Sequence, residues 1–513
     1  MVTEGKGHAQ NSIGRIVLVG LALLLQICWL YSLFFWLNKY STLINFLFSI
    51  ATLVLVLRIY GKHQNSAFKM PWIFLILAFP LLGLFLYLLF GHKNATKRTR
   101  RLFEKIDAKL LPQFGQDPAV MEALEQKDLS VANQCRYIYN YSHYPVYQNT
   151  DARFFADAAD GFEAQLAALA KAERFIFMEY FIIDEGASFA RLKEVLSDRV
   201  RHGVEVRMLY DDVGSIGSLN RSFIRRMEDI GVQCRVFNPV VPILNFFMNN
   251  RDHRKITVID GTVGFTGGYN LADEYFNLTH PYGQWKDTGI MLEGEAVEAL
   301  TAMFLEMWNA MKETDASFSE FFRKRPRSSA PDGFVQLYAD CPLDGEPLGE
   351  NVYINLIDNA ERSLYVMTPY LIISDEMTRA LTLAAKRGVD VRIITPGIPD
   401  KKLIYKITRS YYAGLVRGGV RIFEYTPGFV HAKQVLCDGE AAVVGTINFD
   451  YRSLYHHFEN GALLYGYSAV GDIAADFENT FSVSREVTAE YREGRNAVLR
   501  ITQCILRLAA PLL

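Results

Sequence analysis

Residues 253–270 read HRKITVIDGTVGFTGGYN, and residues 431–448 read HAKQVLCDGEAAVVGTIN. The two stretches agree in every offset: Lys stands 2 residues after His, Asp 5 after Lys, Gly 7 after Asp, and Asn 17 after His. A single His-x-Lys would mean little. Two copies with four matching spacings indicate an internal duplication.

The chain around the two motifs repeats in the same order. Apolar, strand-like runs at 175–183, 202–209 and 231–237 correspond to runs at 364–373, 387–394 and 419–425, and helical patterns precede the first of each set. Buried strands that alternate with helices predict an α/β fold with mixed sheets. We expect two sandwich halves, 136–330 and 331–494, related by a pseudo-twofold axis with a shared site on it.

Each motif is expected to form a β-hairpin. The β-rich runs Ile256–Ile259 and Thr262–Phe265 are separated by Asp260-Gly261, a favoured two-residue turn. Side chains alternate between faces along a strand, so this register places a set of residues on one face. That set is His253, Lys255, Thr266, Gly268 and Asn270, matched by His431, Lys433, Thr446 and Asn448 in the second half. The hairpins therefore predict a phosphate-binding surface that carries two imidazoles.

Four carboxylates accompany the motifs. Asp260 and Asp438 fall in the turns, away from the reactive face, so we interpret them as turn formers or supports rather than proton donors. Asp287 and Glu459 follow their histidines by 34 and 28 residues. We expect each to bind Nδ1 of the histidine in its own half, which would fix the tautomer and leave Nε2 free.

Composition excludes several classes of protein. Of 513 residues, 50% are hydrophobic and 21% charged, which excludes a disordered chain. The 54 basic and 56 acidic residues give a net charge of −2, without the basic excess of a dedicated nucleic-acid binder. The 6 cysteines form no CxxC pair, which argues against a zinc site or a disulfide scaffold and indicates a reducing compartment.

The N-terminal 91 residues have the pattern of a membrane anchor. The uncharged runs Ile16–Leu37, Ser41–Leu57 and Trp72–Phe90 approach the roughly 20 residues that span a bilayer. We expect two or three transmembrane helices within 1–91. A signal peptide is the alternative for the first run, but no Ala-x-Ala-like exit follows it. Basic residues are denser after the third run than before it, which predicts that everything after residue 91 is cytoplasmic.

Three further segments have weaker patterns. Residues 92–135 are polar and are expected to form a partly helical linker. The apolar, Pro-broken segment 239–248 lies just before the first motif, where it could be core packing or a lip that dips into the membrane. The C-terminal segment 495–513 interleaves apolar residues with arginines, typical of an interfacial amphipathic helix or of an ordinary packing helix.

The doubled His-x-Lys-x4-Asp pattern, with Gly-x2-Asn after it, resembles the phospholipase D superfamily. The stretches 177–181, 210–215, 408–412 and 448–453 are similar to bacterial cardiolipin synthases, and the resemblance covers about residues 65–513. Three differences stand out: the third apolar run, Thr446 where Ser is usual, and His457 where Asn is common.

The resemblance implies a membrane-bound phosphatidyltransferase in the bacterial plasma membrane. Such an enzyme joins two phosphatidylglycerols into cardiolipin and releases glycerol, through a phosphatidyl-histidine intermediate. We expect His253 to attack and His431 to transfer protons. Lys255, Lys433, Asn270, Asn448, Thr446 and Gly268 would bind phosphate, and Asp260 and Asp438 would support the site.

No metal or other cofactor is expected, because one phosphodiester replaces another. The expected partners are phosphatidylglycerol and anionic lipid, not nucleic acid. Hydrolysis to phosphatidic acid and transfer to another alcohol remain alternatives. A nuclease of the same superfamily and a catalytically silent membrane scaffold are further ones.

Overall fold

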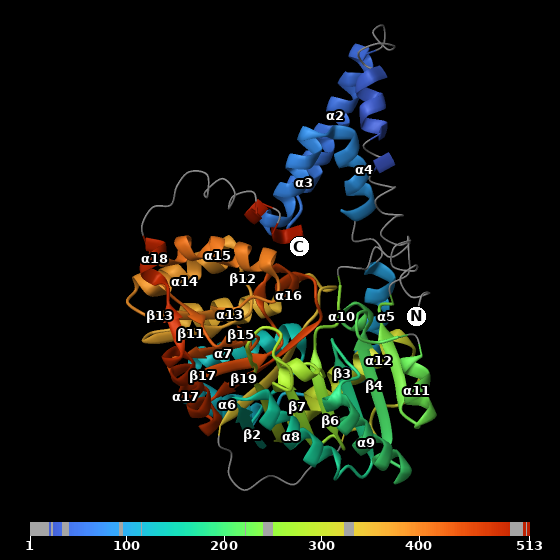
Figure 1. The fold of residues 1–513 in the computed structure, drawn as a ribbon, viewed down its shortest axis with the longest axis vertical. Helices are drawn as coiled ribbons and strands as arrows, with labels where there is room; N and C mark the ends of the chain where they lie inside the picture. Colours follow the sequence, from blue (N-terminus) through green and yellow to red (C-terminus); the bar gives the residue numbers. More distant parts are fainter. Residues whose placement is uncertain are drawn as a thin grey trace. The chain divides into compact units, whose positions relative to one another are not determined.

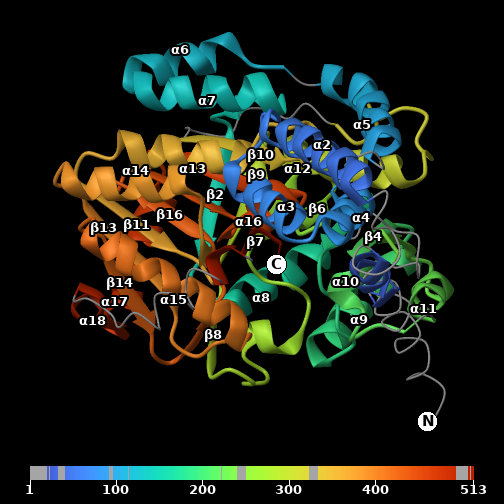
Figure 2. The ribbon, with the colours of Figure 1, turned by 90° about the horizontal axis from the view of Figure 1, so that it is seen from above.

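The computed structural model describes residues 20–21, 24–32, 41–91, 96–113, 115–220, 222–239, 250–322, 333–492, 506–508 and 510–512. The chain divides into two compact units (Figures 1 and 2). The smaller unit contains the N-terminal helices and the C-terminal segment from Val498, and the larger contains Thr99–Pro239 and Asn249–Ala497. Residues 240–248 of the apolar segment and most of 495–513 lie outside the described residues, so their membrane contacts stay predictions.

The smaller unit is helical. It contains α2 (Ser41–Tyr60), α3 (Ser66–Ala78), α4 (Pro80–Phe90) and the short 3₁₀ helix η3 (Ala510–Leu512). The third apolar run, expected as one helix, is divided at Phe79–Pro80 because proline lacks an N–H and disfavours helical backbone in the preceding residue. The first run, 16–37, lies mostly outside the described residues. Among the residues that the structure describes, none of the helices combines the length and the apolar character that crossing a membrane requires.

The larger unit is built on two mixed sheets in its described part. One has the strand order β2-β9-β7-β6-β3-β4-β5, and the other β1-β10-β19-β17-β16-β11-β13-β14-β20. The central seven strands of the second sheet follow the same order as the seven of the first. Strands β3, β4 and β5 are parallel to one another, and so are the corresponding strands β11, β13 and β14. The predicted mixed α/β architecture is thereby confirmed.

The elements of the first half are β2 (Thr150–Phe155), α8 (Ala158–Leu169), β3 (Phe175–Tyr180), α9 (Ala187–Arg201), β4 (Glu205–Asp211), α10 (Asp212–Ser215), α11 (Phe223–Asp229), β5 (Gln233–Phe237), β6 (Lys255–Ile259), β7 (Val263–Gly267), η2 (Asp273–Phe276), β8 (Gln284–Lys286), β9 (Gly289–Gly294) and α12 (Val297–Met311).

Those of the second half are β10 (Phe334–Asp340), α13 (Leu348–Asn359), β11 (Ser363–Met367), β12 (Leu371–Ile372), α14 (Asp375–Lys386), β13 (Asp390–Pro396), α15 (Lys402–Arg417), β14 (Arg421–Tyr425), β15 (Gly428–Val430), β16 (Gln434–Cys437), β17 (Ala441–Gly445), β18 (Phe449–Asp450), α16 (Tyr451–Tyr455), β19 (Glu459–Tyr465), α17 (Ser468–Ser482), β20 (Ser484–Glu486) and α18 (Thr488–Arg492).

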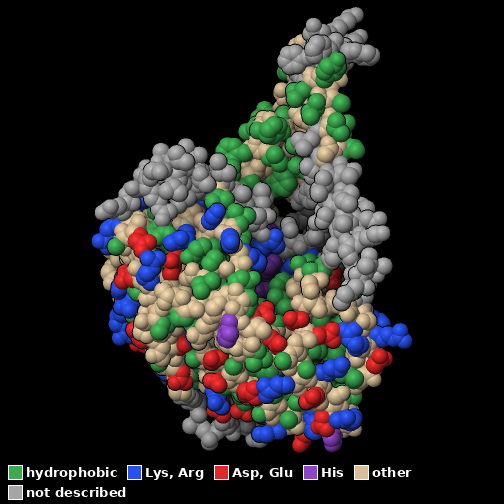
Figure 3. Space-filling view, in the orientation of Figure 1, with side chains coloured by type: hydrophobic (Ala, Val, Ile, Leu, Met, Phe, Trp, Pro, Cys, Tyr) green, Lys and Arg blue, Asp and Glu red, His purple; other side chains and the backbone are tan. Residues whose placement is uncertain are grey.

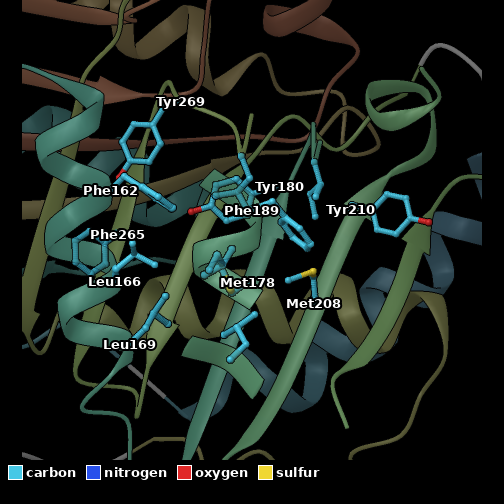
Figure 4. Close-up of a cluster of buried hydrophobic side chains, with 14 of the residues drawn as sticks. Phe162, Leu166, Leu169, Met178, Tyr180, Phe189, Met208, Tyr210, Phe265 and Tyr269 are labelled. Atoms are coloured by element: carbon cyan, nitrogen blue, oxygen red, sulfur yellow. The ribbon is translucent and has the colours of Figure 1, made fainter. Parts of the chain in front are cut away.

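Helices cover both faces of each sheet. In the first half, side chains of α8 and α9 pack against β3, β4 and β7 in the cluster drawn in Figure 4, which includes Phe162, Met178 and Phe265. On the opposite face, Phe177 of β3 stacks on Phe304 of α12, with ring centroids 4.6 Å apart. The two halves lie side by side in Figures 1 and 2, so the sheets hold their hairpins at a common interface.

The segment expected as a linker, 92–135, is largely helical. It contains α5 (Thr96–Leu110), η1 (Leu111–Gln113), α6 (Pro118–Lys127) and the start of α7 (Leu129–Ser142). Helix α7 packs on the second half, where Gln336 donates hydrogen bonds to the carbonyls of Cys135 and Tyr144. Strand β1 (Val146–Tyr147), expected in the first half, pairs with β10 of the second. From Thr99 onward this segment is therefore part of the larger unit.

The two motif hairpins have the predicted turn but a different register. Asp260 and Gly261 have φ of 54° and 67°, as a type I′ turn requires, and Asp438 and Gly439 have 55° and 71°. However, the first cross-strand pair is Ile259–Val263, which leaves Thr262 as an extra residue on β7. The prediction that Lys255 faces Thr266 is wrong, because the shift of one residue pairs Thr266 with Ile256 and turns it to the other face.

Candidate active site

Each motif histidine is anchored to the opposite half of the molecule. The backbone N–H of His253 donates to the carbonyl of Phe458 at 2.9 Å, and that of His431 donates to the carbonyl of Lys286 at 2.7 Å. Strand β15, just before His431, pairs with β8 of the first half. Both imidazoles are buried at this interface, and the charge of His431 acts on His253. The two halves thus contribute to one shared site.

The carboxylates bind the imidazoles in a crossed arrangement. Nδ1 of His253 lies 2.9 Å from Oε1 of Glu459 in the second half. Nδ1 of His431 lies 2.6 Å from Oδ2 of Asp287 in the first half. The expectation that each carboxylate binds the histidine of its own half is wrong. Asp287 directly follows Lys286, whose carbonyl binds the N–H of His431. Glu459 directly follows Phe458, whose carbonyl binds the N–H of His253. In both pairs the carboxylate occupies Nδ1, which leaves Nε2 available for chemistry.

Gly268 and Thr446, each fifteen positions after a motif histidine, lie against the two carboxylates. A Cβ on Gly268 would lie 2.0 Å from Oδ1 of Asp287, so only glycine leaves room for that carboxylate. At the equivalent position, the hydroxyl of Thr446 donates to Oε2 of Glu459 at 2.5 Å. Gly268 and Thr446 were predicted to line the phosphate site. The structure instead places both against the carboxylates that hold the imidazoles.

The lysines lie beside the imidazoles and are buried. Nζ of Lys255 donates to the backbone carbonyl of His253 at 2.5 Å, and Lys433 makes the same bond to His431. Burial lowers the pKa of Lys255 to about 7 and that of Lys433 to about 8. A phosphate anion would favour their charged forms, so this arrangement is suited to binding an anion that brings its own charge.

The imidazoles are held neutral, but not equally. Burial, followed by the charge of Lys255, lowers the pKa of His253 well below its ordinary value. Burial and Lys433 lower the pKa of His431 to about 4, against the opposing effect of Asp287. Burial raises the pKa of Glu459, whereas in Asp287 the charges of His431 and Lys433 outweigh burial and lower it. The ionised Asp287 makes His431 the easier of the two imidazoles to protonate.

The motif asparagines differ in their contacts. Asn270 is held within the first half by both of its polar atoms: its Oδ1 accepts from the N–H of Ile182 and its Nδ2 donates to the hydroxyl of Tyr275. Asn448 is buried, and its Oδ1 has no hydrogen-bond partner among the described residues.

Asp260 and Asp438 lie at the far ends of their hairpins. Asp260 accepts hydrogen bonds from the backbone N–H groups of residues 173, 174 and 175, and Asp438 from those of 361, 362 and 363. At about 3.3 Å per residue, Asp260 is roughly 20 Å along the strand from His253. These aspartates tie each turn to the start of β3 or β11, as their predicted supporting role requires, and do not reach the imidazoles.

Four residues without a sequence-based assignment complete the surroundings. Phe181 packs edge-on to His253 at 5.0 Å between ring centroids, and Tyr275 and Trp285 lie 5.3 and 5.4 Å from His431. His457 is buried 5.6 Å from His253. The aromatic rings exclude water around both imidazoles. In the sequence, Trp285 stands two residues before Asp287, and His457 is one of the differences from the family pattern.

A duplicated α/β sandwich with a His–Lys pair from each half at the interface defines an enzyme of the phospholipase D superfamily. The family described as "Cardiolipin synthase, PLD-like domain" matches residues 165–308 and 353–481, and a phospholipase D-nuclease N-terminal family matches residues 47–92. A cardiolipin synthase of Geobacillus kaustophilus is 34% identical over 93% of this chain and 95% of its own length.

Two further comparisons give a protein without an assigned function and a solved structure of the same fold. An uncharacterised protein of Streptococcus mutans is 41% identical over 89% of this chain and 99% of its own length. The crystal structure of phosphatidylserine synthase from Haemophilus influenzae has a TM-score of 0.55 at 14% identity, covering 74% of this chain and 99% of that one, which shows the common fold. The chain belongs to the cardiolipin synthase family, and it is a phosphatidyltransferase.

Proposed function

We propose that this enzyme transfers a phosphatidyl group from one phosphatidylglycerol to a second, which yields cardiolipin and glycerol. The crossed pairing of His253 with Glu459 and of His431 with Asp287 carries the proposal. It supplies two oriented imidazoles at one interface, as a double displacement at phosphorus requires.

In the first step, Nε2 of His253 attacks the phosphorus and the bond to the glycerol oxygen breaks. The negative charge of the bound phosphate favours protonation of His431 on Nε2, and His431 gives this proton to that oxygen as it leaves. The easier protonation of His431 beside Asp287, and the more strongly neutral state of His253, support this division of roles. Lys255, Lys433 and Asn448 stabilise the charge on the non-bridging oxygens.

In the second step, Nε2 of His431 accepts the proton of a glycerol hydroxyl on the incoming phosphatidylglycerol. The resulting alkoxide attacks phosphorus and the P–N bond to His253 breaks. The two steps restore the protonation state of both imidazoles. The aromatic rings packed around the imidazoles favour the lipid alcohol over water as acceptor.

We also propose that the enzyme works at the bacterial plasma membrane, held there by its N-terminal helices with the larger unit on the cytoplasmic side. Large apolar side chains on α2 and α3 are more than half exposed, among them Phe46, Leu53 and Leu77. Figure 3 shows hydrophobic side chains gathered over these helices, whereas acidic and basic side chains are interspersed over the larger unit. Apolar surface of this extent is characteristic of a membrane contact.

The direct test uses vesicles that contain headgroup-labelled phosphatidylglycerol, without nucleotide or added metal. We expect labelled glycerol and cardiolipin in equal amounts, and neither product with His253→Ala or His431→Ala. Phosphatidic acid in place of cardiolipin would make the enzyme a hydrolase. Product formation that depends on added serine or ethanolamine lipid would change the acceptor, and undiminished product in either alanine variant would contradict the site.

A further inference from the structure

His457 is a third imidazole at the site, and the proposed mechanism does not use it. Its side chain is about nine-tenths buried, and neither ring nitrogen has a hydrogen-bond partner among the described residues. Nδ1 of His457 lies 3.7 Å from Oε1 of Glu459, the oxygen that also lies 2.9 Å from Nδ1 of His253. Burying an unpaired polar ring costs free energy, so a ligand that used its nitrogen would remove a penalty.

The geometry of this group fits a transition-metal ion. One ligand atom from each of His253, His457 and Glu459 lies within 4.8 Å of the others, and all three side chains are buried. Zinc bonds of about 2.0–2.1 Å at tetrahedral angles place ligand atoms about 3.3 Å apart, between the two distances given above. Two imidazoles and one carboxylate are a common zinc-binding set that leaves a fourth position open.

The surroundings orient the ligands but also limit the affinity. Thr446 donates to Oε2 of Glu459 and holds the carboxyl group in place, with Oε1 between the two imidazoles. Lys255 and Arg452 place positive charge near His457. That charge opposes a bound cation, so the site is suited to reversible binding of an ion rather than to permanent retention of a structural one.

We propose that His253, His457 and Glu459 bind a single Zn²⁺ ion, and that this ion switches phosphatidyl transfer off. Binding at Nδ1 of His253 releases its proton to solvent and takes Glu459 as a metal ligand. The imidazole then donates electron density to the metal, so Nε2 becomes a poorer nucleophile. The inhibition rests on the proposed function, whereas the binding of zinc does not.

The binding test uses the full chain in detergent, stripped with EDTA and titrated with ZnCl₂ in equilibrium dialysis, followed by X-ray absorption at the zinc edge. We expect one Zn²⁺ per chain with two imidazole nitrogens and no sulfur. His457→Asn should weaken binding at least 10-fold, and His202→Asn, at an exposed position after α9, should leave it unchanged. Sulfur ligands, or binding indifferent to His457→Asn, would overturn the proposal. The absorption spectrum of the wild type decides it even if the variant fails to fold.

The activity test separates the two proposals. Zinc should inhibit the wild type and EDTA should restore it, while His457→Asn, active without zinc, should need at least 10-fold more zinc for the same inhibition. Equal sensitivity of the two proteins would overturn the switch. Normal zinc binding with no cardiolipin formed under any condition would instead contradict the proposed function.

Discussion

Oε1 of Glu459, in the second half of the chain, lies 2.9 Å from Nδ1 of His253 in the first half. Asp287 and His431 form the reciprocal pair at 2.6 Å. Each half therefore carries an imidazole whose carboxylate belongs to the other half. The catalytic unit is the closed pair of halves, and a half on its own would lack the group that orients its histidine.

The crossed pairs predict the effect of neutralising their carboxylates. Glu459→Gln and Asp287→Asn keep the size of the side chain but replace the carboxyl group that holds Nδ1 of the imidazole with an amide. We expect kcat for cardiolipin formation to fall by about 10²–10⁴-fold, with little change in KM. Asp260→Asn is the matched control, because Asp260 accepts hydrogen bonds from backbone N–H groups at the far end of the hairpin. This variant should have a lower melting temperature than the wild type, with kcat close to the wild-type value. Wild-type kcat in both carboxylate variants would contradict the pairing.

Gly268 predicts a steric test of the same pair. In Gly268→Ala the added methyl would lie 2.0 Å from Oδ1 of Asp287, so the carboxylate must move away from His431. We expect kcat to fall by about 10-fold or more, since small displacements of catalytic groups are costly. Gly471→Ala, in α17 with no atom within 4 Å of the added methyl, should leave kcat unchanged. Equal rates for the two variants would show that Asp287 does not depend on the space at Gly268.

The buried lysines and histidines predict the pH dependence of kcat/KM. Lys255 and Lys433 must be protonated to bind phosphate, and their pKa values of about 7 and 8 in the free enzyme mean that kcat/KM falls as the pH rises through that range. His253 must be neutral to attack, and its lowered pKa moves loss of the nucleophile well below pH 6.5. His431 must be protonated to act as the acid, and its pKa of about 4 in the free enzyme adds an earlier decline of kcat/KM above that pH. An alkaline decline that begins only near pH 10, where ordinary lysines titrate, would contradict this assignment.

The buried Lys255 is expected to be needed for activity but to lower the stability of the fold. Because its pKa is lower in the folded than in the unfolded state, the unfolded chain binds more protons between about pH 7 and 10.5, and stability should rise with pH through that window. Lys255→Met removes the buried charge. We expect a higher melting temperature than the wild type at pH 6, together with loss of transferase activity. A lower melting temperature at pH 6 would show that the charged lysine stabilises the fold.

The sequence indicated the repeat, the alternation of strands and helices, and the residues of both motifs, because those depend on local periodicity and fixed spacing. It did not indicate which carboxylate meets which histidine, since these contacts join residues 206 and 144 positions apart. It also missed the hairpin register, which depends on whether Thr262 joins the strand ladder or is left out of it. The pairing of β1 with β10 also depends on tertiary contacts, which the two residues of β1 do not determine by themselves.

The most direct measurement locates the covalent intermediate. Full-length enzyme is mixed with phosphatidylglycerol labelled at phosphorus, quenched under alkaline denaturing conditions and mapped by mass spectrometry. We predict at most one lipid phosphate per chain, on the peptide that contains His253, and none in His253→Ala. Label on neither histidine, or label that persists in His253→Ala, would contradict the claim that both imidazoles serve one phosphorus atom with His253 as the nucleophile.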